Sequence, residues 1–286
     1  MNKQYDIGDD EIRVIGSDGG NGRNKLPWWT WLLLGIAAIV IIVVIALHHK
    51  PQHGTPGDTY TNAASETLAV DIWLDNIDEA LPSCIVATDT VIDSLHLRIL
   101  IPYNAVPELH VGQLDTTDPD IILAAMAADL RRDNGKIVGA FVYAGEPLSW
   151  GLSKRGYCAI IDGRVTVGTA DNSPLFEQAT EQGGHFFRQY PAVDNGKPVK
   201  NNPENASFRR ALCNLDGTLC LVVCTDRVLM NDFNATLAKL GVDEAILLVG
   251  GTSDGWYRTP DGTLTRLGSS YSKNKKFINH IVFRKQ

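Results

Sequence analysis

Residues 249–254 have the composition of a ligand-binding loop, because an apolar segment ends there in two glycines and three small polar residues, VGGTSD. Glycines after a strand let backbone amides approach a ligand, since no Cβ is in the way. The neighbouring hydroxyls and carboxylate can then form hydrogen bonds with that ligand. An ordinary tight turn is the alternative interpretation of the same pattern. The candidate residues of this loop are Gly250, Gly251, Thr252, Ser253 and Asp254.

Two adjacent arginines, Arg209 and Arg210, lie shortly before a predicted hairpin. Neighbouring residues on a strand point to opposite faces, so at most one of the two can face a given site. Arginine suits bidentate binding of phosphate or carboxylate. A pair of solvated surface charges is the alternative.

Further candidates lie in the middle of the chain, in loops next to apolar segments. His185 and Arg188 follow a glycine pair, and His185 can act as an acid or base or simply pack between aromatic residues. Gly145 and Glu146 follow an apolar segment, although loop carboxylates are usually only solvated. Trp150, in the same loop, offers an indole ring that can stack on a sugar.

The overall charge restricts the kind of ligand. The chain has 286 residues and a formal net charge of −7 at pH 7. A nucleic-acid-binding protein would need a basic face to neutralise phosphates, so we expect no nucleic-acid partner. A small anionic ligand remains possible, because a local group of arginines can be positive on an acidic protein.

Residues 28–47, WWTWLLLGIAAIVIIVVIAL, form an uncharged apolar segment of the length needed to cross a bilayer as a helix. Three tryptophans at its start suit the membrane interface. A buried soluble helix and a cleaved signal peptide are the alternatives. Arg13, Arg23 and Lys25 precede the segment, and only Lys50 follows it closely, so we expect the N-terminus to be cytoplasmic and the rest of the chain extracytoplasmic.

Four regions are therefore expected: a cytoplasmic tail (1–27), a transmembrane helix (28–47), a flexible linker (48–66) and an extracytoplasmic domain (67–286). Short segments rich in β-branched and aromatic residues recur in this domain, separated by turn residues. Asp162-Gly163 and Asp216-Gly217 predict two-residue hairpins. Two helices are expected, over 118–135 and 231–241. The fold class is thus α+β, with a mixed, largely antiparallel sheet.

The five cysteines are expected to lie on the oxidising side of the membrane. Cys213 falls opposite Cys220 in the hairpin centred on Asp216-Gly217, which suggests a disulfide. The turn length makes this a hydrogen-bonded pair, however, where the Cα atoms are too far apart for easy bridging, so we favour buried thiols. The spacing of Cys220 and Cys224 does not suit zinc, and the sequence predicts no metal site and no cofactor.

The motifs of the second half, taken in order, resemble the phosphodiester glycosidase family. They are an Arg-x-Ala-Leu segment, the hairpin NLDGTLCLVV, a helix ending in Leu-Gly, and Ala-x-x-Leu-x-Gly-Gly-x-Ser. The resemblance covers residues 207–257 best and 136–168 less well, and it is greatest for bacterial members with a membrane anchor. It implies hydrolysis of a sugar-phosphate diester.

Matched residue by residue, the resemblance assigns the family's arginine to Arg209 and also retains Gly145, Gly250, Gly251 and Ser253. Four positions differ. The family's loop aspartate is replaced by Val249 and its asparagine by Tyr143, while Thr252 stands in place of the third glycine and Asp254 in place of the second serine.

Two hypotheses follow from the resemblance. In the first, the chain is a hydrolase in which Arg209 holds phosphate and Asp254 with Glu146 supplies the two carboxyl groups of glycoside cleavage. In the second, it binds a sugar phosphate, glycan or envelope polymer without cleaving it. A scaffold for other envelope proteins is a third reading, without a distinctive feature.

Overall fold

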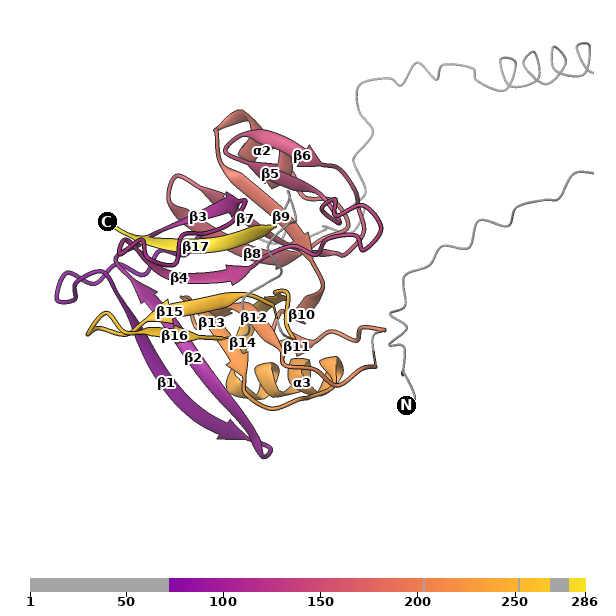
Figure 1. The fold of residues 1–286 in the computed structure, drawn as a ribbon. Coiled ribbons are helices and arrows are strands. Elements are labelled where there is room, and N and C mark those ends of the chain that lie inside the picture. The colour runs from indigo at the N-terminus through magenta and orange to yellow at the C-terminus, as the bar shows by residue number, and fades with distance from the viewer. Residues whose placement is uncertain (1–71, 203, 252, 268–277) are drawn as a thin grey trace, which may run out of the picture. The chain divides into compact units, whose positions relative to one another are not determined.

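A computed structural model of the chain describes residues 72–202, 204–251, 253–267 and 278–286. These residues belong to one compact unit that consists of three β-sheets and two helices (Figure 1). Every strand pairing between its named strands is antiparallel, so the expectation of a largely antiparallel α+β domain is confirmed.

The largest sheet contains seven strands in the order β1-β2-β13-β12-β14-β10-β11. The Asp216-Gly217 hairpin is confirmed, and its register sets Cys213 opposite Cys220. Side chains along β12 and β13 alternate between two buried clusters, which explains why both strands are apolar throughout. Its strands are β1 (Cys84–Ile92), β2 (Leu95–Tyr103), β10 (Pro191–Asp194), β11 (Lys197–Pro198), β12 (Arg210–Leu215), β13 (Thr218–Cys224) and β14 (Val242–Leu247).

The second sheet has five strands in the order β16-β15-β4-β17-β3, and it brings the C-terminal strand into the centre of the domain. The third has the order β6-β5-β9-β7-β8 and includes the predicted Asp162-Gly163 hairpin between β7 and β8. The second sheet consists of β3 (Ala105–Val111), β4 (Ile121–Met126), β15 (Gly255–Arg258), β16 (Leu264–Arg266) and β17 (Asn279–Lys285). The third consists of β5 (Phe141–Tyr143), β6 (Glu146–Ser149), β7 (Gly156–Ile161), β8 (Arg164–Thr169) and β9 (His185–Gln189).

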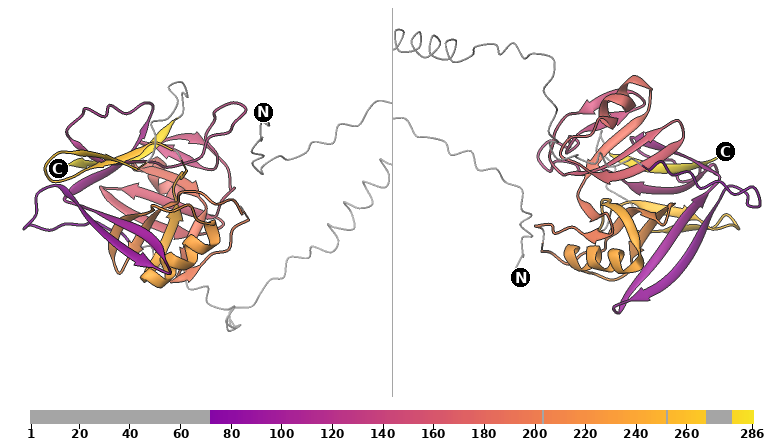
Figure 2. Two further views of the ribbon diagram at one scale, coloured as in Figure 1. Left: turned by 60° about the horizontal axis from the view of Figure 1, so that its bottom comes forward. Right: turned by 180° about the vertical axis from the view of Figure 1, so that it is seen from behind.

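The two helices cover different sheets. Helix α3 (Met230–Leu240) packs on the seven-stranded sheet, and it ends at Gly241 in the left-handed conformation, as its sequence predicts. Helix α2 (Leu175–Glu181) packs on the third sheet through Leu175 and Ala179. Figure 2 shows α3 from two further directions, on the outer side of its sheet.

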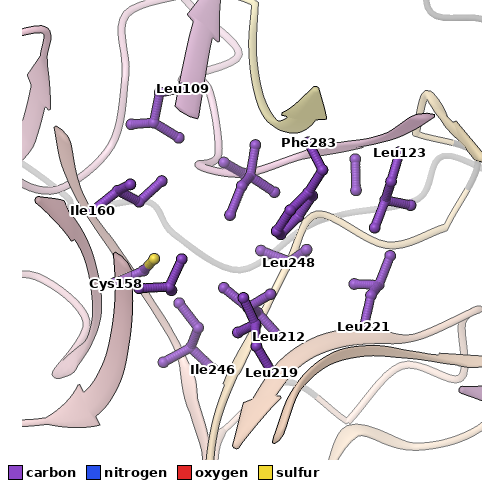
Figure 3. Close-up of a cluster of buried hydrophobic side chains, with 14 of the residues drawn as sticks. Leu109, Leu123, Cys158, Ile160, Leu212, Leu219, Leu221, Ile246, Leu248 and Phe283 are labelled. Carbon is purple, nitrogen blue, oxygen red and sulfur yellow. The ribbon is translucent and has the colours of Figure 1, made fainter. Parts of the chain in front are cut away.

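The main core lies where the three sheets meet. Figure 3 shows side chains from all of them in contact, among them Leu212 of β12, Phe283 of β17 and Ile160 of β7. All three are almost completely buried. At about 25 cal/mol per Å² of buried apolar surface, such a shared core makes the sheets depend on one another for stability.

The helix predicted over residues 118–135 is wrong. Residues Ile121–Met126 form strand β4 instead, between β15 and β17 and buried along its whole length. Ile121, Ala125 and Leu130 occur at helical spacing, but pairing on both sides outweighs the helix propensity of the alanines. The small alanine side chains suit this position, because neighbouring layers cover both faces of the strand.

The apolar segment at 136–145 is strand only over Phe141–Tyr143. The predicted tail, transmembrane helix and linker lie outside the described residues. Within the described residues, no helix has both the length and the apolar character needed to span a bilayer.

All five cysteines are free thiols, and four of them are buried. Burial raises the pKa of the Cys158 and Cys213 thiols, which lowers their reactivity. We therefore expect a maleimide to modify the folded protein at Cys84 before any other cysteine, as measured by peptide mass spectrometry. All five should react once guanidinium chloride unfolds the chain. Equal labelling of Cys84 and Cys158 in the folded protein would contradict the packing described above.

Candidate functional site

The loop between β14 and β15 lies between the start of β12 and the end of β4. The amide of Leu248 donates to the carbonyl of Arg210 at 2.9 Å, and that of Val249 to the carbonyl of Met126 at 3.1 Å. The amide of Gly251 donates to the carbonyl of Phe208 at 2.8 Å. The loop is thus fixed on both sides by backbone hydrogen bonds.

The two glycines are needed for this packing. A Cβ at Gly250 would lie 2.3 Å from the carbonyl oxygen of Phe208, closer than atoms can approach. Gly251 has a φ of +63°, which favours glycine. Their first role is therefore close approach to β12, and the Gly251 amide is already used there. Thr252 lies outside the described residues.

Arg210 is the side chain around which the loop folds. Its Nη1 donates to Ser253 Oγ at 3.1 Å and to the Asp254 carbonyl at 3.2 Å, while Nη2 donates to the carbonyls of Ser253 at 3.1 Å and Leu267 at 2.5 Å. Ser253 Oγ also donates to the Val249 carbonyl. Burial lowers the pKa of Arg210 to about 10, so it remains charged at neutral pH. Arg210 and Ser253 are both buried and engaged within the protein.

Arg209 points in a different direction, as the alternation along a strand requires. Its Nε donates to the Val228 carbonyl at 3.4 Å, and its Nη2 bonds to the Asn205 carbonyl. Its backbone remains close to the loop, because a Cβ on Gly250 would lie 3.6 Å from the Arg209 Cα. The structure therefore places the Arg209 main chain at the loop and its guanidinium beside Asn205 and Val228.

Asp254 is the loop carboxylate that retains access to solvent, with 15% of its side chain exposed. Its Oδ1 lies 3.7 Å from Nη1 of Arg266, whose side chain is 46% exposed. Its Oδ2 lies 4.0 Å from Nε2 of His280. The Asp254 carbonyl also accepts a hydrogen bond from the amide of Met126 at 3.3 Å. Asp254 is thus a partly buried carboxylate between a guanidinium and an imidazole.

His280 is buried, and neither of its ring nitrogens has a hydrogen-bond partner among the described residues. The 4.0 Å separation from Asp254 is too long for a hydrogen bond. Burial, with a smaller contribution from neighbouring His110, lowers the pKa of His280 to about 3. The imidazole is therefore neutral at physiological pH.

A second polar group follows β4 and was not predicted as functional. Asp129 forms an ion pair with Lys154, whose side chain is only 5% exposed. Lys154 Nζ also donates to Gln189 Oε1 at 2.8 Å and lies 4.6 Å from the centre of the Tyr190 ring. Asp129 is itself 39% exposed. Its partners come from distant parts of the chain, so local sequence gives no signal for this group.

Glu146, Gly145 and His185 lie at the turn between β5 and β6. Gly145 has a φ of +79°, and a Cβ there would lie 3.0 Å from the Gly183 Cα. The Ala144 amide donates to Nδ1 of His185 at 3.0 Å. Burial lowers the pKa of His185, so it too favours the neutral form. The Glu146 side chain is exposed at this turn.

Arg188 and Trp150 lie towards the opposite end of the same β5–β6 hairpin. Arg188 is buried, and its guanidinium donates to the carbonyls of Lys154, Ala170 and Asp171 at 3.0–3.1 Å. Trp150 is 71% exposed. The structure thus gathers Gly250, Gly251, Ser253 and Asp254 at one loop, with the Arg209 main chain beside it. Gly145, Glu146, Trp150, His185 and Arg188 lie on the third sheet or beside it. Among the described residues, no group of three or more His, Cys, Asp or Glu side chains is arranged to hold a metal.

Comparison with solved structures finds a similar fold. The chain superposes on the zebrafish N-acetylglucosamine-1-phosphodiester alpha-N-acetylglucosaminidase catalytic domain, auto-inhibited by its pro-peptide, with a TM-score of 0.52 and 14% identity. The match covers 75% of this chain and 87% of that one. A hypothetical protein from Synechocystis matches with a TM-score of 0.47 at 13% identity, over 70% of this chain and 62% of that one.

No protein-family model matches the sequence, and neither does any curated protein. The chain therefore has a fold distantly similar to that of a phosphodiester glycosidase catalytic domain. Met126 at the end of strand β4 forms backbone hydrogen bonds with Val249 and Asp254 of the β14–β15 loop.

Replacing Arg210 should destabilise the protein far more than replacing Arg209. Arg210→Ala removes four hydrogen bonds, two buried and two partly buried, and we expect a loss of about 2–4 kcal/mol in the free energy of unfolding. Arg209→Ala removes a partly exposed side chain and should cost less than about 1 kcal/mol. Urea denaturation of both variants measures the difference, and equal losses would refute the anchoring role of Arg210.

The neutral state of His280 should make stability fall in acid. Its pKa is about 3 in the folded protein and 6.5 when unperturbed, so below pH 6.5 the unfolded chain binds a proton that the folded chain does not. The free energy of unfolding should therefore drop by up to about 1.4 kcal/mol per pH unit between these values because of His280. His280→Phe should remove this component from urea titrations at pH 4–6. His96→Gln, which replaces an exposed imidazole, is the matched control.

Proposed function

We propose that this chain is a hydrolase of sugar-phosphate diesters, with its reactive groups beside the β14–β15 loop. The observation that supports this most directly is the position of Asp254, a partly exposed carboxylate between Arg266 and His280 on a loop fixed by Arg210. The fold similarity to a phosphodiester glycosidase catalytic domain agrees with this assignment. The motifs around residues 207–257 support it from the sequence.

Glycoside cleavage normally uses two carboxyl groups, and Asp129 is better placed than Glu146 to be the second. Asp254 bonds to Met126 through its carbonyl, and Asp129 is three residues further along that segment. Three residues span at most about 10–11 Å. This upper limit on the chain distance is comparable to the ~6.5–9.5 Å carboxyl separation of an inverting mechanism, which is why we assign the second carboxyl group to Asp129. Glu146 lies instead at the β5–β6 turn, which packs against Gly183 and Gly184.

In this arrangement one carboxyl group donates a proton to the leaving phosphate oxygen, and the other, as carboxylate, accepts a proton from the attacking water. Arg266 is the cation next to Asp254 and is the group we assign to the phosphate, in place of the engaged Arg209. Lys154 holds the Asp129 carboxylate in position. The hydrolysis needs only water as a second reactant.

Binding without cleavage is the second candidate, and Val249 favours it. Val249 occupies the position where the resemblance predicts an aspartate. The backbone amide of Val249 donates a hydrogen bond to the Met126 carbonyl and so holds the loop in place. Arg209 also favours binding without cleavage, because its guanidinium is already hydrogen-bonded to the Val228 and Asn205 carbonyls. A chain lacking both groups can retain a glycan ligand while losing turnover.

We also propose that residues 28–47 anchor the chain in a membrane, with the N-terminus in the cytoplasm and the domain outside. The support for this is the apolar length of the segment and the basic residues that precede it. The substrate is then a sugar phosphate or glycan of the cell envelope.

The assay that tests the proposal is release of chromophore from a chromogenic sugar 1-phosphodiester by the full chain. We expect Asp254→Asn and Asp129→Asn each to lower kcat by about 10²-fold or more, because each removes a proton-transfer group. Asp216→Asn is the matched control, since it makes the same change at an exposed hairpin turn.

Glu146→Gln decides between the two possible second carboxylates. A loss of kcat in Glu146→Gln with none in Asp129→Asn would assign that role to Glu146 and overturn the pairing proposed here. Saturable binding of the diester without turnover in the wild type would support the binding module. If the wild type neither binds nor cleaves the diester, both proposed functions are rejected.

A further inference from the structure

A hollow of about 210 Å³ lies on the third sheet, away from the β14–β15 loop. One side is formed by Trp150 and Leu152, which are 71% and 69% exposed. The opposite side is formed by Phe176 and Glu177 of helix α2. Ala140, Gly151, Asn172, Ser173 and Arg188 complete the lining.

The hollow is a rigid feature because Arg188 ties both of its sides together. This buried guanidinium donates to the carbonyl of Lys154 on the Trp150 side, and to those of Ala170 and Asp171 on the side that leads into α2. The backbone of residues 139–140, which lies next to Arg188 and Gly151, is also closely packed. The Ala140 amide donates to the Gly151 carbonyl at 3.0 Å, and a Cβ on Gly139 would lie 3.2 Å from the Arg188 Cβ.

The lining indicates what kind of molecule fits. An exposed indole offers an apolar face for the C–H groups of a ring, while Asn172 and Glu177 offer hydrogen-bonding groups for hydroxyls. The volume is below the 300–1,000 Å³ of sites for drug-sized ligands, which suits a single ring. The Glu177 carboxylate would repel an anionic ligand. The Arg188 guanidinium already donates hydrogen bonds to three backbone carbonyls, so it does not offset that repulsion.

We propose that this hollow is a subsite for one neutral pyranose ring, stacked on Trp150 and hydrogen-bonded by Asn172 and Glu177. The inference does not require cleavage at Asp254, because a glycan-binding module would use the same subsite. It makes Trp150 a contact residue. Arg188 becomes a positioning residue, in place of its expected direct role in binding substrate.

Saturation-transfer NMR on the full chain tests this proposal, with methyl glycosides of glucose, galactose, mannose and N-acetylglucosamine as probes. We expect at least one of them to bind, and Trp150→Ala to weaken its Kd by about tenfold or more through loss of stacking. Trp150→Tyr keeps an aromatic face and should restore most of the affinity. Leu229→Ala removes another exposed apolar side chain, 42% exposed and outside the hollow, and should leave Kd unchanged.

Charge selectivity gives a second readout, with glucose 1-phosphate as the probe. The wild type should prefer the neutral methyl glucoside, and Glu177→Gln should reduce that preference by removing the repulsion. The proposal is overturned if Trp150→Ala binds every glycoside as well as the wild type, if no glycoside binds, or if cyclohexanol binds better than all of them. If the wild type binds a glycoside at this hollow but does not cleave the diester, the hydrolase proposal is rejected and the subsite proposal is retained.

Discussion

The buried guanidinium of Arg210 connects the start of β12 to the two ends of the β15–β16 pair, a link that strand pairing does not supply. It extends from the first residue of β12, gives three of its hydrogen bonds to Ser253 and Asp254, and gives the fourth to Leu267 just after β16. The seven-stranded sheet is thereby joined to the second sheet at the loop that holds Asp254. These four hydrogen bonds from Nη1 and Nη2 offset the cost of burying the charge, so the loop conformation and the burial of Arg210 depend on each other.

This dependence changes the meaning of the glycine motif. The sequence favours a loop whose amides face a ligand, whereas the structure uses Gly250 and Gly251 to bring the chain against Phe208. Ser253 is likewise engaged with Arg210 and Val249. What remains for chemistry is Asp254, which the packed loop holds at the surface with Arg266 beside it. The motif therefore forms a packed support, and its last residue is the carboxylate to which we assign the chemistry.

Local patterns predicted the parts of the fold that local physics determines. The two Asp-Gly hairpins and helix α3 follow from turn geometry and a C-terminal glycine, and all three are present. Strand β4 was missed because its alanines favour a helix in isolation, while its strand neighbours are distant in sequence. Alternation correctly implied that only one of Arg209 and Arg210 faces the loop, but the choice of Arg210 depends on the tertiary register. The Asp129–Lys154 pair joins segments 25 residues apart, and no local pattern marks it.

Lys154 links the two regions to which we assign function. Its carbonyl accepts a hydrogen bond from Arg188, which forms the base of the hollow beside Trp150, and its ammonium group pairs with Asp129. The residue has a φ of +69°, a backbone conformation that costs free energy for any residue except glycine. Contacts on both its backbone and its side chain hold it there. A ring in the hollow would contact Arg188, whose hydrogen bond to the Lys154 carbonyl joins the proposed subsite to the segment that carries the Asp129 ion pair. Lys154 is therefore the structural connection between the proposed sugar subsite and the carboxylate proposed to act in cleavage.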